Sequence, residues 1–187
     1  MNKNDLRYRT TEKLICDAYI KLSNEKNGNK ITVTELVKEA NINRGTFYLH
    51  YQDVNEVCKD IADKFLKECL RIINHDGDIS LNKEAILNTL KYIKENKNYV
   101  NFIIQDNFKS FISKGIVDYI KNEIIKKYKL VLDFDEEKMK PIVTYMVFGS
   151  VALIVDWAKN DYEDQIETIA ESLSLSNETI IKNFFLK

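Results

Sequence analysis

The sequence is poor in residues that interrupt helices and in residues that build metal or disulfide sites. It has one proline and five glycines among 187 residues, and its two histidines lie far apart in the chain. Few helix breakers, abundant Lys, Glu, Ile and Leu, and no regular apolar–polar alternation predict an all-α fold. The three cysteines, Cys16, Cys58 and Cys69, form no CxxC pair. An odd number on apolar helix faces predicts buried reduced thiols, without disulfides or a bound metal.

An excess of charge of either sign is also absent, because the formal net charge is -1. A polyanionic partner would therefore have to meet local positive charge. One such cluster, at the start of the chain, consists of Lys3, Arg7, Arg9 and Lys13. The N-terminus is polar and has no apolar signal segment, which favours a cytoplasmic protein. No phosphate-binding glycine loop, GxSxG or HExxH pattern occurs, so neither an enzyme activity nor a cofactor is predicted.

The most informative stretch is 32–51, with the sequence TVTELVKEANINRGTFYLHY. Thr32 and Glu35 have the spacing of a capping box, in which the hydroxyl accepts from a free amide and the carboxylate reaches back. Apolar residues then recur at helical spacing. Asn41 begins a turn, and Asn43 has the side chain of a good cap for a second helix. The stretch therefore predicts two short helices joined by a tight turn.

The second of these helices has an apolar side and an outward side. Phe47 and Tyr51, four residues apart, are predicted to point inward together with Ile42. In a helix-turn-helix, the first helix braces the second, which lies in the DNA major groove. A helical hairpin with a purely structural role is the alternative interpretation. The residues predicted to face outward are Arg44, Gly45, Thr46, Tyr48 and Leu49, with His50 beside them.

The capped first helix and the run Asn43-Arg44-Gly45-Thr46-Phe47-Tyr48 resemble the DNA-binding motif of the TetR (tetracycline-repressor) family. Gly45 favours this interpretation over a structural hairpin, because glycine inside a helix costs about 1 kcal/mol relative to alanine. Close approach of the backbone to DNA would give that glycine a reason. In this chain Leu49 would be limited to apolar contact, such as a thymine methyl group. The DNA contacts that the resemblance and the outward positions imply are Thr34, Arg44, Gly45, Thr46, Tyr48, Leu49, His50 and Lys59.

We predict two domains, a helix-turn-helix domain at 1–55 and a helical ligand-binding and dimerisation domain at 56–187. The clearest predicted boundary segment is 75–80, which contains a glycine between aspartates, and 129–136 is predicted to be a loop. Ser176 is expected to cap a last short helix. Besides the two motif helices, the apolar patterns predict helices at about 5–25, 54–73, 82–95, 98–111, 115–128, 139–158 and 164–173.

Residues 142–157 are apolar nearly all round and must be buried on every side if they form a helix. The run is shorter than the ~20 residues that a bilayer requires, so no membrane partner is predicted. Instead we predict a homodimer, in which one side of this helix meets a second copy. Phe148-Gly149-Ser150 and Trp157 also resemble one branch of the TetR family. The residues expected at the interface are Gly149, Ser150, Ala152 and Leu153.

The resemblance implies a transcriptional regulator that binds a palindromic operator in double-stranded DNA as a homodimer. It also implies a small-molecule effector that makes the protein a ligand-responsive repressor, with activation left open. The alternative is an all-helical interaction or dimerisation module without DNA binding. Aromatic residues of the C-terminal half could line an effector cavity, or could simply form the core. These residues are Phe102, Phe108, Tyr119, Tyr145 and Trp157.

Overall fold

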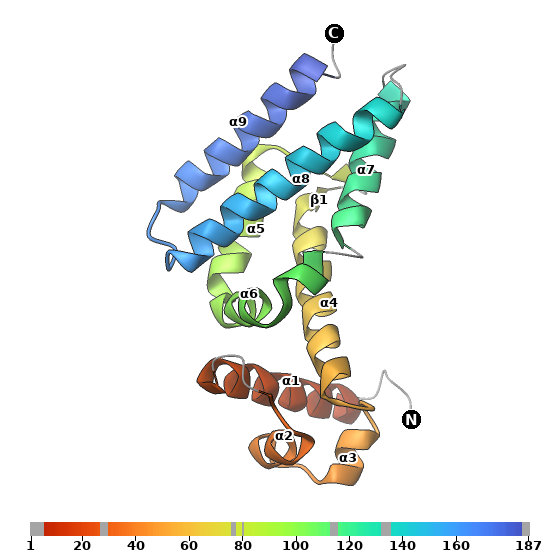
Figure 1. Cartoon of the computed structure of the whole chain (residues 1–187), viewed down its shortest axis with the longest axis vertical. Coiled ribbons are helices and arrows are strands. Elements are labelled where there is room, and N and C mark those ends of the chain that lie inside the picture. The colour runs from red at the N-terminus through yellow and green to blue at the C-terminus, as the bar shows by residue number, and fades with distance from the viewer. Residues whose placement is uncertain are drawn as a thin grey trace. The chain divides into compact units, whose positions relative to one another are not determined.

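The computed structural model describes residues 6–26, 30–75, 78–79, 81–112, 116–131 and 136–184, and these residues are almost entirely helical (Figure 1). The predicted all-α class is confirmed. The helices are α1 (Leu6–Lys26), α2 (Val33–Glu39), α3 (Arg44–Tyr48), α4 (Val54–Ile73), α5 (Lys83–Glu95), α6 (Lys97–Ile112), α7 (Ile116–Val131), α8 (Glu136–Lys159) and α9 (Ile166–Phe184).

The chain forms two compact units. The first unit contains residues 1–65 and 98–106, and the second contains 66–97 and 107–187. Both α4 and α6 therefore contribute residues to each unit. This division describes packing alone, and the predicted functional boundary after residue 55 stays a prediction.

The first unit packs α1, α2 and α3 around a small apolar core, and Figure 1 shows α2 and α3 joined by their short turn. Ile15 of α1, Leu36 of α2 and Phe47 of α3 are each 0% exposed. Tyr51, just after α3, is also buried, which confirms the predicted inward positions of Phe47 and Tyr51. Burial of such side chains is the main favourable contribution to holding these short helices in place.

The start of α2 has the predicted capping box. The Thr32 amide donates to Oε2 of Glu35 at 3.0 Å, and the Thr32 hydroxyl accepts from the Glu35 amide at 3.3 Å. Lys26 of α1 donates to the same carboxylate at 2.6 Å, which joins α1 to α2. Hydrogen bonds from Lys26 and then from Thr32 lower the pKa of Glu35 to about 2.

In the second unit, α5 packs on α9, and α8 packs on both α7 and α9. One apolar cluster joins three of these helices, with Val117 and Ile124 from α7, Met139 and Val143 from α8, and Ile181 from α9. Trp157 lies near the end of α8, is 1% exposed, and donates its indole N–H to the Asp164 carbonyl at 3.0 Å. The link to α9 is tight, because both Asp161 and Tyr162 have positive φ.

At the predicted boundary, β1 (Asn74–His75) and β2 (Asp78–Ile79) pair as a two-residue antiparallel ladder. Two expectations about individual segments were wrong. Ser176 caps no helix, because α9 is continuous from Ile166 to Phe184 and contains neither glycine nor proline. The segment between α7 and α8 is shorter than 129–136, because α7 extends to Val131.

A further correction concerns the apolar run in α8. The helix is 24 residues long, and its segment Glu137–Lys159 is long and apolar enough, by length and composition, to cross a bilayer. Only 28% of that apolar window is buried within the chain. The whole helix, unlike the apolar run 142–157 alone, is therefore long enough to cross a bilayer, and α8 has a side that one copy of the chain leaves uncovered.

We predict a pH-dependent stability difference between the parent protein and Glu35→Gln. The lowered pKa of Glu35 contributes stability that is present above the usual value of 4.5 and is lost as the pH falls toward about 2. The parent should therefore have the higher unfolding midpoint at neutral pH, and the difference should vanish near pH 2. Thermal unfolding followed by circular dichroism measures this. Glu84→Gln, in the first turn of α5, is the control. A difference that did not change with pH would contradict the assignment.

Candidate nucleic-acid interface

The turn between α2 and α3 has the geometry of a Schellman motif. The Ile42 amide donates to the Val37 carbonyl at 3.0 Å, and the Asn41 amide donates to the Lys38 carbonyl at 3.2 Å. Asn41 has φ 52°, the left-handed conformation that asparagine tolerates better than most residues. The backbone therefore reverses direction within a few residues and starts α3 immediately.

Asn43 caps α3 as predicted, since its Oδ1 accepts from the Thr46 amide at 2.7 Å. A second link closes the same end of the motif, because the Arg44 guanidinium donates to the Thr34 hydroxyl of α2. Thr34 and Arg44, which are both predicted to contact DNA, are therefore hydrogen-bonded to each other on the surface. A guanidinium has five N–H donors, so this bond leaves Arg44 further donors.

Gly45 is exposed, as predicted, but the structure gives it a local role that the sequence did not reveal. A Cβ atom at this position would lie 3.2 Å from Oδ1 of Asn43, the oxygen that caps α3. The capping oxygen would have to move to relieve this close contact. Gly45 is therefore explained in part by the cap, and close approach to DNA is not the only reason for a glycine here.

The remaining predicted contacts differ in exposure. Tyr48 and Leu49 are 57% and 63% exposed, which is unusual for large side chains of this kind and leaves both available to a partner. Lys59 of α4 is exposed, while Thr46 is half-buried.

His50 is turned partly inward. Its ring stacks on Tyr8 of α1 at 4.0 Å between centroids, and burial lowers the pKa of His50. Contact of this ring with DNA stays a prediction, but its packing on α1 is a feature that sequence spacing did not indicate.

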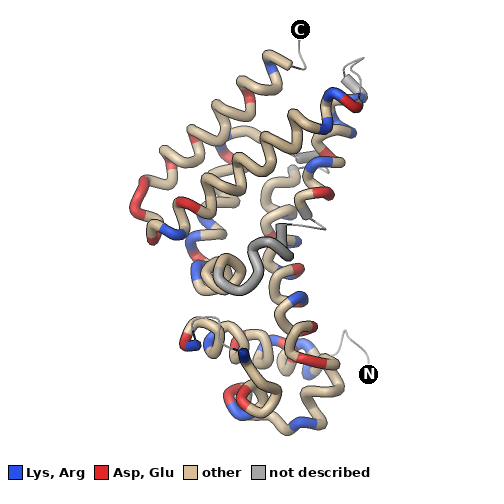
Figure 2. The backbone as a smooth tube through the Cα atoms, in the orientation of Figure 1, with Lys and Arg blue, Asp and Glu red and all other residues tan. Residues whose placement is uncertain are grey.

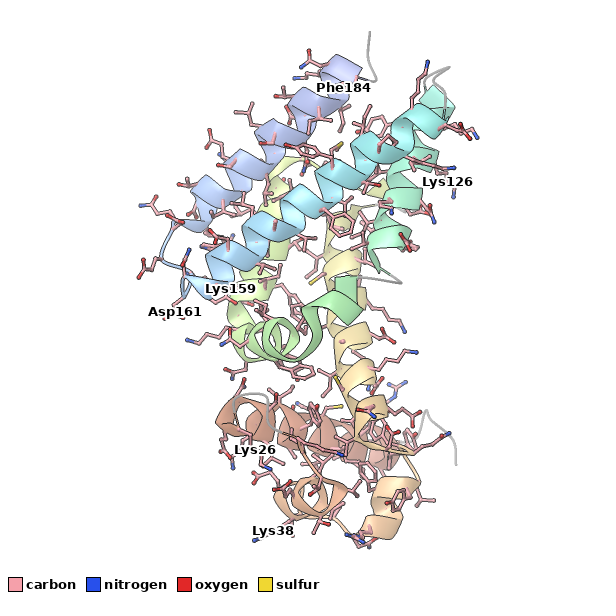
Figure 3. All side chains as sticks on the ribbon, viewed as in Figure 1. Lys26, Lys38, Lys126, Lys159, Asp161 and Phe184 are labelled. Carbon is pink, nitrogen blue, oxygen red and sulfur yellow. The ribbon has the colours of Figure 1, made fainter. Side chains whose placement is uncertain are left out.

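The charges around α2 are arranged asymmetrically. Both of its carboxylates pair with lysines of α1, Glu35 with Lys26 and Glu39 with Lys21. Lys38 and Arg44, in contrast, form no ion pair with any residue that the structure describes. Figure 2 shows the charged positions, and Figure 3 labels Lys38 on α2 and Lys26 on α1. The outer side of the motif is therefore locally positive although the whole chain is nearly neutral.

The start of α4 is negatively charged. Asp53 accepts from the Glu56 amide at 2.9 Å, and Glu56 accepts from the Gln52 amide at 2.6 Å. Asp53 therefore caps α4, whereas Glu56 reaches one residue further back than in a simple capping box. Two carboxylates at this helix start disfavour a phosphate there, so Lys59 is the basic residue of this segment that is left for such a contact.

The predicted aromatic pocket residues occupy different surroundings. Phe102 belongs to the first unit, is 2% exposed and packs edge-on against Tyr19. Trp157 is a core residue of the second unit, whereas Tyr119 and Tyr145 are 42% and 72% exposed. The side chain of Phe108 lies outside the described residues. A common cavity for these residues stays a prediction.

Comparison with known proteins identifies the class of the chain. Residues 82–178, more than half of the chain, match the family TetR_C_8, described as "Transcriptional regulator C-terminal region". The protein belongs to the TetR family of transcriptional regulators.

The similar proteins are regulators as well. The chain is 29% identical over 103 residues to the HTH-type dhaKLM operon transcriptional activator DhaS of Lactococcus lactis, covering 54% of each. It is 23% identical over 175 residues to the uncharacterized HTH-type regulator YxbF of Bacillus subtilis, covering 88% of this chain and 44% of that protein. The chain thus spans about half the length of the curated relatives it matches.

A solved TetR regulator from Streptococcus agalactiae has the same fold. Its TM-score is 0.65 at 17% identity, and the match covers 90% of this chain and 93% of the other. At this level of identity the likeness concerns the fold alone.

The contact between Gly45 and the cap leads to a prediction about stability. Gly45→Ala should gain helix propensity of up to about 1 kcal/mol, offset by crowding of Asn43. Asn43→Ala removes both the cap and the crowding, and should itself cost roughly 1 kcal/mol. In a double-mutant cycle, the alanine at 45 should therefore stabilise the Asn43→Ala background more than the parent. Chemical unfolding measures the four free energies, and strict additivity would show that Gly45 does not serve the cap.

Proposed function

We propose that this protein binds double-stranded DNA through α3 and the outer side of α2, and that it does so as a homodimer on a pseudo-palindromic operator. The observation that carries the proposal is the charge arrangement of the motif. Glu35 and Glu39 are neutralised by α1, whereas Lys38 and Arg44 keep their positive charges facing outward. Phosphates contribute most of the affinity in such complexes. A local positive surface serves this purpose without a basic chain.

The division of roles follows from side-chain chemistry. Arg44 can donate to phosphate or to guanine edges, and Thr34, Thr46 and Tyr48 can donate hydroxyls to phosphate. Leu49 offers only apolar contact, for which a thymine methyl group is the matching feature of a base edge. Contacts to phosphate set the position of the protein on the duplex, and contacts to base edges choose the sequence.

The uncovered side of α8 supports the homodimer. From Pro141 to Val155 the helix has no charged residue, and Tyr145 and Phe148 remain 72% and 41% exposed in one copy. Gly149 and Ala152 lie on the same exposed side, and Figure 2 shows this part of α8 without charged residues. Exposed apolar patches of this kind mark protein interfaces.

The neighbouring surface of α9 is suited to the same interface. Its exposed positions include Ser172, Leu175, Ser176 and Thr179, which are small or uncharged. Ser172 and Thr179 donate to carbonyls of their own helix, at 2.8 and 2.7 Å to Thr168 and Leu175. Their hydroxyls are therefore already satisfied and can be covered by a second copy at little cost. A polar surface beside α8 also fits a protein partner better than lipid.

A small-molecule effector remains part of the proposal because residues 82–178 belong to the C-terminal region of transcriptional regulators. Whether the protein represses or activates transcription depends on the DNA site and on the effector. An effector can change DNA affinity only through a difference in its own affinity for the competent and incompetent conformations.

We predict that Lys38→Gln and Arg44→Gln each weaken DNA binding and lower its salt dependence. For each phosphate that a variant no longer neutralises, the slope of log affinity against log salt should fall by about 0.9. Fluorescence anisotropy with a duplex selected from a random pool gives the affinities over a series of salt concentrations. Lys91→Gln, an exposed lysine of α5, is the control and should leave the slope unchanged. The absence of any salt-dependent binding by the parent would favour the alternative function, a dimerisation module without DNA binding.

The same titrations test the contact surface more severely with Gly45→Glu. A carboxylate at this position would meet phosphate with like charge, so binding should be abolished while the fold and the dimer persist. Gly45→Ala separates this effect from crowding of the cap at Asn43 and should retain most of the affinity. Tyr48→Phe should weaken all sequences nearly alike. Parent-like operator binding by Gly45→Glu would rule out α3 as the reading element.

The homodimer predicts that Ala152→Arg prevents association. The side chain is exposed in one copy, so the substitution should not disturb the chain's own core, yet it would bury an unpaired charge between copies. Gly149→Leu tests the same surface, since a Cβ there meets nothing within 4 Å in one chain. Light scattering at micromolar concentration should report a dimer for the parent and for the control Asn88→Arg on α5, and a monomer for Ala152→Arg. A dimeric Ala152→Arg would refute this interface.

A further inference from the structure

A chain of polar contacts joins the C-terminal end of α3 to α4 and α1 within the first unit. The Tyr51 hydroxyl donates to Oδ2 of Asp60 at 2.6 Å, and Lys64 donates to the same oxygen at 2.7 Å. Lys64 also donates to Glu12 of α1 at 2.7 Å. The Cys16 sulfur lies 3.5 Å from the Tyr51 hydroxyl. None of these residues belongs to the DNA contacts that the sequence predicted.

The hydroxyl of Tyr51 is not needed for burial of the ring. Tyr51 is 4% exposed, and its ring lies 6.1 Å from that of Phe47 in the core of the motif. Phenylalanine would supply the same apolar surface without the cost of desolvating a hydroxyl. Apolar packing is non-directional, whereas a hydrogen bond fixes a distance and an angle. Apolar burial already stabilises the packing of the Tyr51 ring, and the hydroxyl fixes its orientation.

Within this network, the hydrogen bond from Tyr51 to Asp60 contributes more than the ion pair between Asp60 and Lys64, because the hydroxyl is buried. Asp60 and Lys64 have side chains that are 28% and 47% exposed, so the ion pair by itself contributes little. The Tyr51 hydroxyl is buried, and burial raises its pKa far above the usual value, which keeps it a donor at every physiological pH. Burial likewise raises the pKa of the Cys16 thiol to about 11, so the neighbouring sulfur stays neutral.

The bond from Tyr51 to Asp60 matters for the position of α3 because this helix is short. A helix of five residues is not stable alone, so its position depends on attachments at both ends. Asn43 and the Arg44–Thr34 bond hold the N-terminal end. At the other end the Tyr51 side chain donates to Asp60 of α4, and the backbone amide of the next residue, Gln52, donates to Glu56 of the same helix.

We propose that Tyr51, with Asp60 as its acceptor and Lys64 holding that acceptor, is a positioning residue for DNA reading, although it does not touch DNA. The hydroxyl fixes the C-terminal end of α3 against α4, so that the exposed side chains of α3 reach base edges together. This inference rests on the proposed DNA-binding function. Contacts to phosphate tolerate small displacements, whereas bidentate contacts to bases do not.

The test compares Tyr51→Phe with Tyr99→Phe. Tyr99 of α6 also donates its hydroxyl to a carboxylate in the same unit, that of Asp17 of α1 at 3.4 Å, and its ring stacks on Phe65 of α4. Affinities for the selected operator and for a scrambled duplex are measured well below the unfolding midpoint. Because a hydrogen bond to a charged group is at stake, the operator-to-scrambled ratio should fall about tenfold in Tyr51→Phe. The scrambled affinity and the salt slope should stay unchanged, and Tyr99→Phe should behave as the parent.

Two results would overturn the inference. The first is a parent-like ratio in Tyr51→Phe with only a lower unfolding midpoint, which would make the bond merely structural. The second is a ratio that falls equally in Tyr99→Phe. Should Tyr51→Phe fail to fold, Asp60→Asn takes its place, because the asparagine oxygen still accepts from Tyr51 but no longer attracts Lys64 as a charge. That variant should lower the ratio by less than tenfold, and an unchanged ratio would overturn the inference.

Amide exchange of the free protein separates this inference from the proposed function. If the parent prefers no DNA sequence, the proposed function fails, but the positioning of α3 can still be measured. The amides from Phe47 to Tyr51 should exchange faster in Tyr51→Phe than in Tyr99→Phe. Equal exchange rates would show that the hydroxyl does not hold α3.

Discussion

The first unit depends on one constraint, which is that α2 and α3 are too short to be stable by themselves. Helices of seven and five residues gain too few internal hydrogen bonds to offset the entropy of ordering them. Their positions are therefore set by caps at Thr32 and Asn43, by burial of Leu36 and Phe47, and by polar bonds to neighbouring helices. These attachments also determine where the exposed side chains of α2 and α3 lie, and those side chains form the candidate interface.

The same attachments shape the electrostatics. Lys21 and Lys26 bind α1 to α2 through the carboxylates of α2, and in doing so they remove negative charge from the motif. The cations of Lys38 and Arg44 are then left to set the local field. These exposed ion pairs add little to packing, which the buried core supplies, but they explain how a chain of net charge -1 can present a site for a polyanion.

Much of the motif could be predicted from the sequence because its signals are local. A cap, a capping box and a four-residue apolar spacing involve neighbours within a few positions, and the structure confirms Thr32, Asn43, Phe47 and Tyr51 in these roles. The predicted DNA contacts are placed on or near the surface of this motif, but their contact with DNA stays a prediction.

The sequence did not reveal features that depend on contacts between distant residues. The packing of His50 on Tyr8 and the bond from Lys64 to Glu12 join positions more than forty residues apart. The continuity of α9 is not apparent from the sequence for a different reason, because Ser176 has a side chain that commonly caps helices. Asn177, the residue after it, is buried and within 3.5 Å of the Ser150 hydroxyl, so packing against α8 sustains the helix there.

The central claim is that α3 of each copy lies in a major groove of the same duplex. Guanine methylation interference on a duplex selected from a random pool tests it most directly, because N7 of guanine lies in the major groove alone. We expect two patches of interference centred about one helical turn, roughly 10 base pairs, apart and related by a twofold axis. Tight, sequence-specific binding without interference at any guanine N7, or with a single patch, would contradict the claim.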